Sequence, residues 1–483
     1  MKEQESGLTF TPTGDAIVTR SIPDPTAGDA PSGFGPVVDR LRSADITTTN
    51  LEVVIADGEQ AATPPRVVPD QYQYLASFPG MVIHAPPGIL DDLSAIGIDM
   101  VSAASNHSLD FGRVGMERTM AALEARDIPY AGLGPSLESA RAPAYTGSPD
   151  GRVGLVGATT SVPPGGEAGP TGSWFPGATG VSPLAVRWRY GVTPEHLAAL
   201  REVAAATGID AATDTWRSRE VPDTGDPGIG AADAAGDSGP ADTDRDELQF
   251  MHMSFETVGA DEDPGIRYGL HAPDRTAILE QVAESASVAG TTIMSLHSHQ
   301  APGGVRNRPE TPDFLIEFAH DCIDAGADAF VGTGPHVLRG IEIYRDRPIF
   351  YSLGNFFCQF ETMGQLPPQS FEYYGLADDR RPSSVFDARY YDADGTPTGN
   401  LAYPEYWRTV VPTCQFDPDG TLDRIELLPC SLGRTRDRPV RGTPRTAEGE
   451  TATAILDEFE ALSDPFGTVI QREGDRGYVV AGG

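Results

Sequence analysis

Residues 326–357 read GADAFVGTGPHVLRGIEIYRDRPIFYSLGNFF, and this stretch decides the fold. Its residues 328–332 predict a short buried strand, after which a turn rich in glycine and proline presents His336. Two further strand-like runs lie on either side of residues 345–348. A histidine just past a strand, on a turn whose glycines permit unusual backbone angles, is well placed to bind a metal ion. One histidine does not define a site, so similar strand ends elsewhere in the chain carry the argument.

Four other predicted strands, at residues 8–13, 45–50, 99–103 and 291–296, also end in polar clusters. The side chains that follow them are Asp15, Glu52, Asn106 with His107 and Asp110, and His297 with His299. Each cluster alone has an ordinary alternative, because an acid after a strand is a common turn residue and two histidines can lie in an exposed loop. Five such clusters together favour a shared site.

Helical patterns separate most of these strands. They cover residues 36–43, 86–96, 113–126, 193–208, 274–289 and 311–326, and a further strand is predicted at 152–159. This alternation of strands and helices predicts an α/β layered fold. In such folds the carboxyl ends of the strands gather at one edge, where ligands bind.

The side chains expected at that edge are imidazoles, an amide and carboxylates. This set suits Zn, Mn or Fe(II), whereas Ca or Mg would call for fewer imidazoles. Two ions about 3.5–4 Å apart, bridged by a carboxylate, would activate water near neutral pH and hold the leaving oxygen. His107 would then donate a proton to the leaving group, and Asp110 would fix its orientation.

Composition narrows the class of protein. The chain of 483 residues has 70 acidic and 35 basic residues, a net charge of −35, and Lys2 is its only lysine. So negative a surface repels phosphate backbones and argues against nucleic-acid binding. It suggests adaptation to high salt, with a GC-rich genome as the alternative.

We expect a cytoplasmic protein without a membrane span. No apolar run approaches the length that a span needs, and the first residues, MKEQESGLTF, lack the pattern of a secretory signal. The cysteines Cys322, Cys358, Cys414 and Cys430 lie far apart in the sequence and predict free thiols in a reducing compartment.

Two regions are expected to add little to the site. Residues 210–247 are poor in large apolar residues and predict a disordered acidic insertion within a domain that spans residues 1–360. Residues 361–483 contain strands around a turn at 418–420 and a helix at 451–462. We expect this carboxy-terminal region to pack on the same domain.

Taken together, the motifs resemble those of the CapA-type proteins, which are named for capsule and poly-γ-glutamate synthesis and belong to the calcineurin-like metallophosphoesterase superfamily. The resemblance covers about residues 8–360 and is carried by Gly14-Asp15, Asn50-Leu51-Glu52, Asn106-His107-x-x-Asp110-x-Gly112, His297-x-His299, Gly334-Pro335-His336, Ile341-Glu342-x-Tyr344 and residues 351–356. It implies a four-layer α/β/β/α sandwich with a dinuclear metal site. The implied ligands are Asp15, Glu52, Asn106, His297, His299 and His336, and the implied acid pair is His107 with Asp110.

The sequence departs from the family pattern at two positions. Ser105 stands where the family has the first of two asparagines, and Thr333 stands where it commonly has a histidine. A threonine hydroxyl is a far weaker ligand than imidazole for these metals. At one of the two implied metal positions, three outcomes therefore stay open: the position is weakened, it is occupied by a harder ion, or it is lost.

Together with the site residues, the resemblance implies a metal-dependent hydrolase of the metallophosphoesterase type, associated with poly-γ-glutamate or a related anionic polymer. The alternative is a catalytically weak accessory protein that holds a ligand or a synthase partner on the same scaffold, which Thr333 favours. Among other residues, Glu256 could approach the substrate from a strand predicted at 249–253, and Glu342 and Asn355 could order loops behind the site. His320 is expected to be a packed or surface residue.

Overall fold

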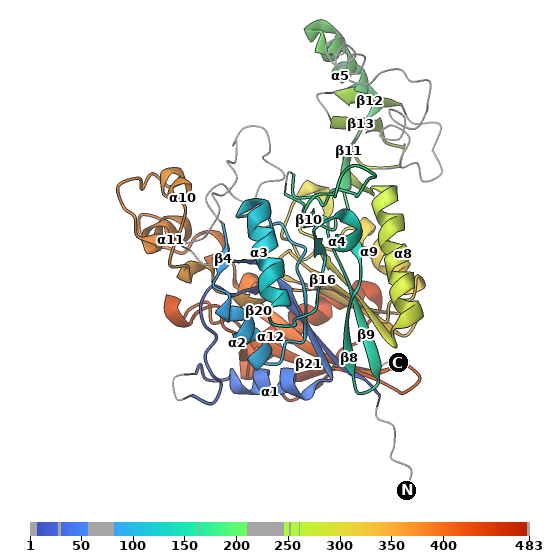
Figure 1. Cartoon of the computed structure of the whole chain (residues 1–483). Helices are drawn as coiled ribbons and strands as arrows, with labels where there is room; N and C mark the ends of the chain where they lie inside the picture. Colours follow the sequence, from blue (N-terminus) through green and yellow to red (C-terminus); the bar gives the residue numbers. More distant parts are fainter. Residues whose placement is uncertain are drawn as a thin grey trace.

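The computed structural model describes residues 7–27, 30–56, 82–163, 165–209, 246–250, 253–259 and 261–480. The predicted insertion at 210–247 lies outside these ranges, except for its last two residues. Strands and helices alternate along the described chain (Figure 1), and the predicted α/β class is confirmed.

The larger of two main sheets has ten strands, in the order β23-β24-β21-β20-β1-β2-β5-β6, with β19 beside β1 and β22 beside β21. Its central strands β19, β1, β2 and β5 run parallel to one another. The bounds are β1 Thr9–Ile17, β2 Ile46–Leu51, β5 Met100–Ser102, β6 Tyr130–Ala131, β19 Asn355–Cys358, β20 Arg408–Phe416, β21 Leu422–Ser431, β22 Arg445–Thr446, β23 Gln471–Glu473 and β24 Arg476–Val480.

The second sheet has six strands in the order β17-β18-β16-β15-β9-β8, and β9, β15, β16 and β18 are parallel. The bounds are β8 Ala144–Ser148, β9 Gly151–Thr159, β15 Thr291–His297, β16 Ala329–Thr333, β17 Leu338–Tyr344 and β18 Arg347–Leu353. The strands β16, β17 and β18 all come from the stretch that opened the sequence analysis.

The two sheets share one apolar core. It joins Phe10 and Ile46 of the larger sheet to Ile293 and Phe350 of the smaller one, and helix α12 (Gly449–Ser463) closes it with Phe459. Burial of apolar surface drives this packing. Apolar side chains from both sheets therefore fill the space between them.

Helices cover the outer face of each sheet. The helices α1 (Gly35–Ser43) and α2 (Gly88–Ala95) pack with the ends of β1 and β19, whereas α8 (Ala272–Val288) and α9 (Asp313–Asp324) pack on β15, β16 and β18. Figure 1 shows these two groups on opposite sides of the molecule. Helix α3 (Gly112–Glu124) forms a smaller cluster with residues that follow β5.

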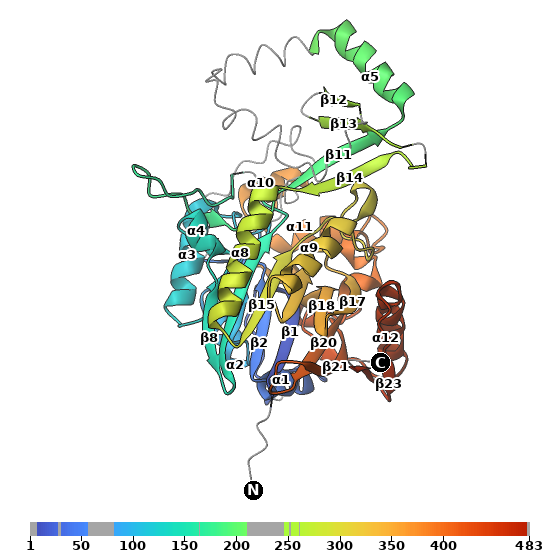
Figure 2. The ribbon, with the colours of Figure 1, turned by 90° about the vertical axis from the view of Figure 1, so that its right-hand side faces the viewer.

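A third, four-stranded sheet projects from this body (Figure 2), and its order is β12-β13-β11-β14. Its strands are β11 Val186–Val192, β12 Glu247–Phe250, β13 Met253–Thr257 and β14 Gly265–Leu270, and α5 (Pro194–Thr207) follows β11. The prediction of one strand at 249–253 was wrong. Two antiparallel strands occupy this region, and Phe250 of β12 pairs with Met253 of β13.

The carboxy-terminal strands extend the larger sheet. Strand β20 pairs antiparallel with β1 through Phe10 and Cys414, and β21 pairs with β20 along its length. All four cysteines are buried free thiols. Across the described residues, no helix combines the length and apolarity needed to cross a membrane.

Candidate metal centre

The parallel register of the larger sheet places two acids side by side. Asp15, near the end of β1, stands opposite Asn50 of β2 and Asn355 of β19. Glu52 follows the last residue of β2. Both acids are fully buried, with no exposed side-chain surface.

The smaller sheet contributes two histidines to the same place. His297 is the last residue of β15, and it stands between Thr159 of β9 and Thr333 of β16. His299 follows two residues later. The Nδ1 atom of His297 lies 3.4 Å from Oδ1 of Asp15, so the carboxyl ends of the two sheets meet here.

Two turns complete the site. Asn106 lies between β5 and α3, and its Oδ1 is 2.8 Å from His297 Nε2 and 3.0 Å from His299 Nε2. His336 lies between β16 and β17 in the left-handed region, with φ of 60°. Gly334, with φ of 107°, approaches so closely that an added Cβ would lie 2.8 Å from the backbone nitrogen of Ser298. These backbone angles are the kind that favour glycine, as the sequence indicated.

The side chains form two overlapping groups that could hold metal ions. One group is Glu52, His297 and His299, and the other is Asp15, Glu52 and His336. In each group the three potential ligand atoms lie within 4.8 Å of one another. Glu52 belongs to both groups, and with Asn106 beside the first, the structure brings together all six residues that the sequence indicated as ligands.

Three asparagines orient the histidines and acids of the site. Of these three, only Asn355 was expected from the sequence to have a role. Asn50 Nδ2 donates to Asp15 Oδ1 over 2.8 Å. Asn355 Oδ1 lies 2.9 Å from His336 Nδ1, in direct contact with the site. Asn307 Oδ1 lies 2.7 Å from His299 Nδ1. Asn307 lies in a loop with no sequence signal of its own, whereas Asn50 stood in a quoted motif.

Thr333 does not belong to either group of potential ligands. Its Oγ1 lies 3.1 Å from His297 Nδ1, and its backbone oxygen accepts a hydrogen bond from Ser298. Its exposed fraction is 1%. Thr333 therefore positions His297 in this structure. Each group of potential ligands still contains imidazole nitrogen, from His297 and His299 in one group and from His336 in the other.

Burial and mutual charge shift the pKa values at this site. Burial raises the pKa of Asp15, but hydrogen bonds and charge from His297 and His336 outweigh it, so that its pKa lies below the ordinary value. Burial, together with the charges of Asp15 and Asp110, raises the pKa of Glu52 well above its ordinary value. Burial lowers the pKa values of His297 and His299, which favours neutral imidazoles able to bind metal.

Glu52 gives the clearest test of whether this site fits a metal ion. Neither of its carboxylate oxygens has a hydrogen-bond partner among the described residues. A buried acceptor without a partner costs about 1–3 kcal/mol, and more when it is charged. A carboxylate that is fully buried, without donors and surrounded by imidazole nitrogens has the surroundings of a metal ligand. The residues present therefore fit divalent cations.

His107 and Asp110 form a pair beside Glu52. His107 Nδ1 lies 2.6 Å from Asp110 Oδ2, and its Nε2 lies 4.0 Å from Glu52 Oε1. The same Asp110 oxygen accepts a 2.6 Å hydrogen bond from the backbone of Ile83. Burial raises the pKa of Asp110, and the charge of His107 opposes that rise. Asp110 thus holds the imidazole with Nε2 directed toward the acids.

Other residues considered in the sequence lie elsewhere. Glu256 is within β13 of the projecting sheet, with an oxygen 3.5 Å from Arg189 Nη1. Glu342 bonds to His320 Nε2 at 3.0 Å and to the hydroxyl of Tyr351, so it joins α9 to the sheet and contacts none of the predicted ligands. His320 also stacks on Tyr344, with ring centres 4.0 Å apart, which agrees with a packed residue.

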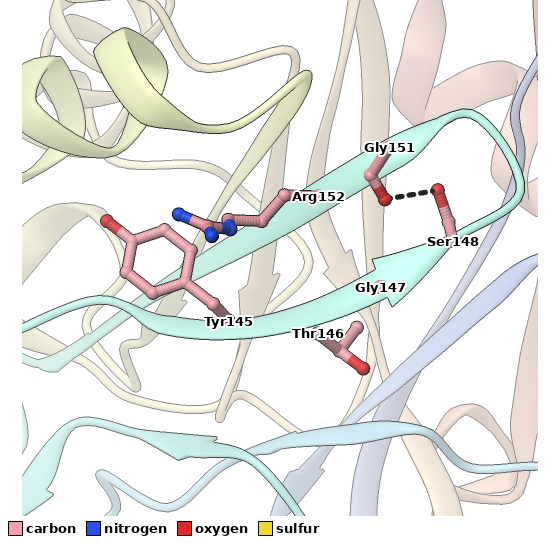
Figure 3. A pocket seen from close by; sticks show the side chains of 6 residues that line it. All are labelled: Tyr145, Thr146, Gly147, Ser148, Gly151 and Arg152. Carbon is pink, nitrogen blue, oxygen red and sulfur yellow. Dashed lines mark hydrogen bonds between the residues drawn. The ribbon is translucent and has the colours of Figure 1, made fainter.

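A separate surface hollow lies along the β8–β9 hairpin (Figure 3). It is lined by Tyr145, Thr146, Gly147, Ser148, Gly151 and Arg152. Gly151 and Thr159 are at opposite ends of β9, and the strand between them spans about 26 Å. The hollow is therefore remote from the candidate metal centre, and we assign it no part in the site.

Comparison with known proteins supports one family. Residues 9–359 match the family described as bacterial capsule synthesis protein PGA_cap. The chain is 33% identical over 475 residues to the uncharacterized protein y4sH of Sinorhizobium fredii, which covers 97% of this chain and 92% of that protein. It is 26% identical over 348 residues to a probable polyglutamine synthesis accessory protein of Mycobacterium tuberculosis, covering 72% and 64% of the two chains. It is 36% identical over 88 residues to the PGA biosynthesis protein CapA of Bacillus subtilis, covering 18% and 22%. The chain therefore belongs to the bacterial capsule synthesis protein family PGA_cap.

Proposed function

We propose that this protein is a metal-dependent hydrolase of the metallophosphoesterase type that acts in the synthesis or processing of poly-γ-glutamate or a related anionic capsule polymer. The observation that carries the proposal is Glu52, which is shared by two groups of potential ligands and has no hydrogen-bond partner for either oxygen among the described residues. Membership of the capsule synthesis family supports the link to the polymer.

The residues that would hold the metal are Asp15, Glu52, Asn106, His297, His299 and His336, and Glu52 belongs to both groups of potential ligands. This mixture of nitrogen and oxygen donors suits Mn, Zn or Fe. When bound, such ions supply Lewis acidity and lower the pKa of water so that it reacts near neutral pH.

The chain's own residues would orient the ligands and donate the proton. Asn50, Asn307 and Asn355 fix the orientation of the ligands through the contacts described above. Asp110 holds the Nδ1 proton of His107, so that protonated His107 can donate from Nε2 to the leaving oxygen of an ester as its bond to phosphorus breaks. Ile83 keeps Asp110 in place through its backbone nitrogen.

We further propose that the two main sheets and their outer helices form the four-layer α/β/β/α sandwich of the metallophosphoesterases. The shared core between the sheets supports this assignment. The pairing of β20 with β1 supports a single domain in which residues 361–483 belong with residues 1–360. Fold alone does not fix a substrate, so the reaction needs a direct test.

The test is metal analysis of the purified protein combined with a Mn-dependent assay on bis-p-nitrophenyl phosphate. We expect about two ions per chain and turnover that Asp15→Ala and His336→Ala abolish. His196→Ala, which removes an exposed histidine on α5, is the matched control and should behave as wild type. Absence of both bound metal and turnover would contradict the proposal.

That outcome would favour the second candidate, an accessory protein that holds a polymer or a synthase partner. Thr333 favours it, because a threonine replaces a histidine expected from the family resemblance. The name of the Mycobacterium tuberculosis relative is that of an accessory protein, which points the same way. An accessory protein should bind poly-γ-glutamate, or a synthase, without any dependence on His107.

A further inference from the structure

The loop after His299 returns to the candidate metal centre. It passes through a 3-10 helix, η1 (Pro302–Gly304), where Gly303 and Gly304 have φ of 75° and 78°. Gln300 then forms an isolated antiparallel bridge with Arg306, and Ala301 N donates to the oxygen of Val305 over 3.0 Å. The loop thus brings Arg306 back beside the strand end that carries His297 and His299.

Contacts on both sides fix this loop. The backbone nitrogen of Asn307 donates to His299 O over 3.0 Å, in addition to the side-chain contact between these residues. From the projecting sheet, Tyr268 donates its hydroxyl to Ala301 O over 2.7 Å. From β17, Arg339 donates to the oxygen of Gln300 over 2.6 Å. The position of Arg306 is therefore built into the fold.

The guanidinium of Arg306 is partly buried and forms no hydrogen bond or ion pair with any residue in the described ranges. Two other arginines with buried surroundings do have partners: Arg339 donates to backbone oxygens, and Arg441 pairs with Glu361 at 2.8 Å. The nitrogens of Arg306 are not among the fully buried polar atoms without a partner, so they remain open to an anion that arrives from solvent.

The charge of Arg306 acts on the candidate metal centre. It contributes to the lowered pKa of His299 and opposes the rise in the pKa of Glu52, and burial lowers its own pKa. Arg306 nevertheless forms no ion pair with Glu52. The cation therefore acts on the potential ligands without forming an ion pair with them.

We propose that Arg306 forms an oxyanion subsite beside the candidate metal centre and that it receives a phosphate group, with preference for phosphomonoesters over phosphodiesters. The planar guanidinium can donate two parallel hydrogen bonds to phosphate oxygens. A phosphomonoester offers a third terminal oxygen and a second negative charge that a diester lacks, and this extra charge is what an unpaired cation would select. The inference rests on the proposed phosphoesterase-type function.

The experiment compares Arg306→Ala and Arg306→Gln with Arg306→Lys, which keeps the charge but loses the planar fork. Arg308→Ala is the matched control, because Arg308 is an exposed arginine two residues away on the same loop. Orthophosphate binding is measured by calorimetry on manganese-loaded and metal-free protein. Metal content is measured for each variant, with KM and kcat for p-nitrophenyl phosphate and bis-p-nitrophenyl phosphate.

We expect Arg306→Ala and Arg306→Gln to weaken orthophosphate binding and to raise KM for the monoester about ten- to hundredfold. Metal content and KM for the diester should stay within about threefold of wild type. For Arg306→Lys, orthophosphate affinity and KM for the monoester should lie between the values of wild type and Arg306→Ala. Arg308→Ala should match wild type. Unchanged orthophosphate binding in folded Arg306→Gln, or equal effects on both esters, would overturn the inference.

The design separates this inference from the proposed function. If the protein binds no metal and turns over neither ester, the proposed hydrolase fails, but orthophosphate binding by metal-free protein still tests Arg306. Loss of that binding on substitution would then support the subsite. If metal binds and both esters turn over with wild-type values in Arg306→Gln, the hydrolase stands and the subsite falls.

Discussion

Asp15 of β1 and Asn50 of β2 stand opposite each other in the larger sheet, and Asn50 Nδ2 donates a 2.8 Å hydrogen bond to Asp15 Oδ1. The same Nδ2 lies 3.1 Å from Nδ1 of His297, at the end of the smaller sheet. Asp15 Oδ2 accepts a further hydrogen bond from the backbone of Gly334. One amide thus links both sheets at the candidate centre, and the protein itself orients Asp15.

We predict that Asn50→Ala weakens metal binding about 10- to 100-fold, the usual cost of losing a group that orients a ligand. The affinity for Mn²⁺ or Zn²⁺ is measured by calorimetry. Asn400→Ala is the matched control, since Asn400 offers only its backbone oxygen, to Trp407. Wild-type affinity in Asn50→Ala would show that Asp15 and His297 do not depend on this amide.

Glu52→Gln should remove the stabilising effect of the metal ion without disrupting the fold. Because neither oxygen of Glu52 has a hydrogen-bond partner among the described residues, replacing the acid by an amide should not destabilise the metal-free protein and can stabilise it by about 1 kcal/mol. In urea unfolding, manganese should raise the free energy of unfolding of wild type relative to a chelator, as any ligand of the native state does. In Glu52→Gln, manganese should no longer raise the free energy of unfolding.

Glu342→Gln provides the contrast for this measurement. Glu342 is also an acid in a largely buried position, but it bonds to His320 and Tyr351. Its substitution should lower the free energy of unfolding equally with and without manganese. If Glu52→Gln behaves in the same way, Glu52 has a structural role and the shared-ligand assignment is wrong.

Thr333→Val tests one of the two residues that depart from the family pattern, the threonine that stands in place of a histidine. Valine keeps the volume and removes the hydroxyl that lies 3.1 Å from His297 Nδ1. We predict about tenfold weaker metal binding, whereas Thr333→Ser, which keeps the hydroxyl, should stay close to wild type. Metal affinity measured for both variants decides between a positioning role and a passive one. Equal affinities would leave Thr333 without influence on His297.

Local patterns predicted the parts of this fold that depend on local sequence. Strand β15 was expected at 291–296 and spans Thr291–His297. A helix was expected at 193–208 and spans Pro194–Thr207; the hydroxyl of Thr193 accepts from His196 N, and Gly208 ends the helix with φ of 71°. Such features follow from side-chain period and capping chemistry within a few residues.

Features set by distant contacts were not predictable in the same way. Two strands replace the single one expected at 249–253, because Phe250 and Met253 belong to different strands that pair with each other, which apolar content alone does not reveal. Asn307 and Arg306 reach the site only because the loop after His299 turns back on itself. The sharing of Glu52 between two groups depends on how the two sheets pack, which no single strand encodes.

His107→Asn tests the proposed proton donor. If His107 protonates the leaving oxygen, its loss matters most when that oxygen is a poor leaving group, because p-nitrophenolate departs readily without a proton. We therefore predict that kcat falls about 100-fold or more for phenyl phosphate but less than about tenfold for p-nitrophenyl phosphate, with metal content unchanged. Since Nε2 of His107 lies 4.0 Å from Glu52, metal content must be measured in the same samples. Equal losses for both esters would indicate that His107 serves binding or structure and that the proton comes from elsewhere.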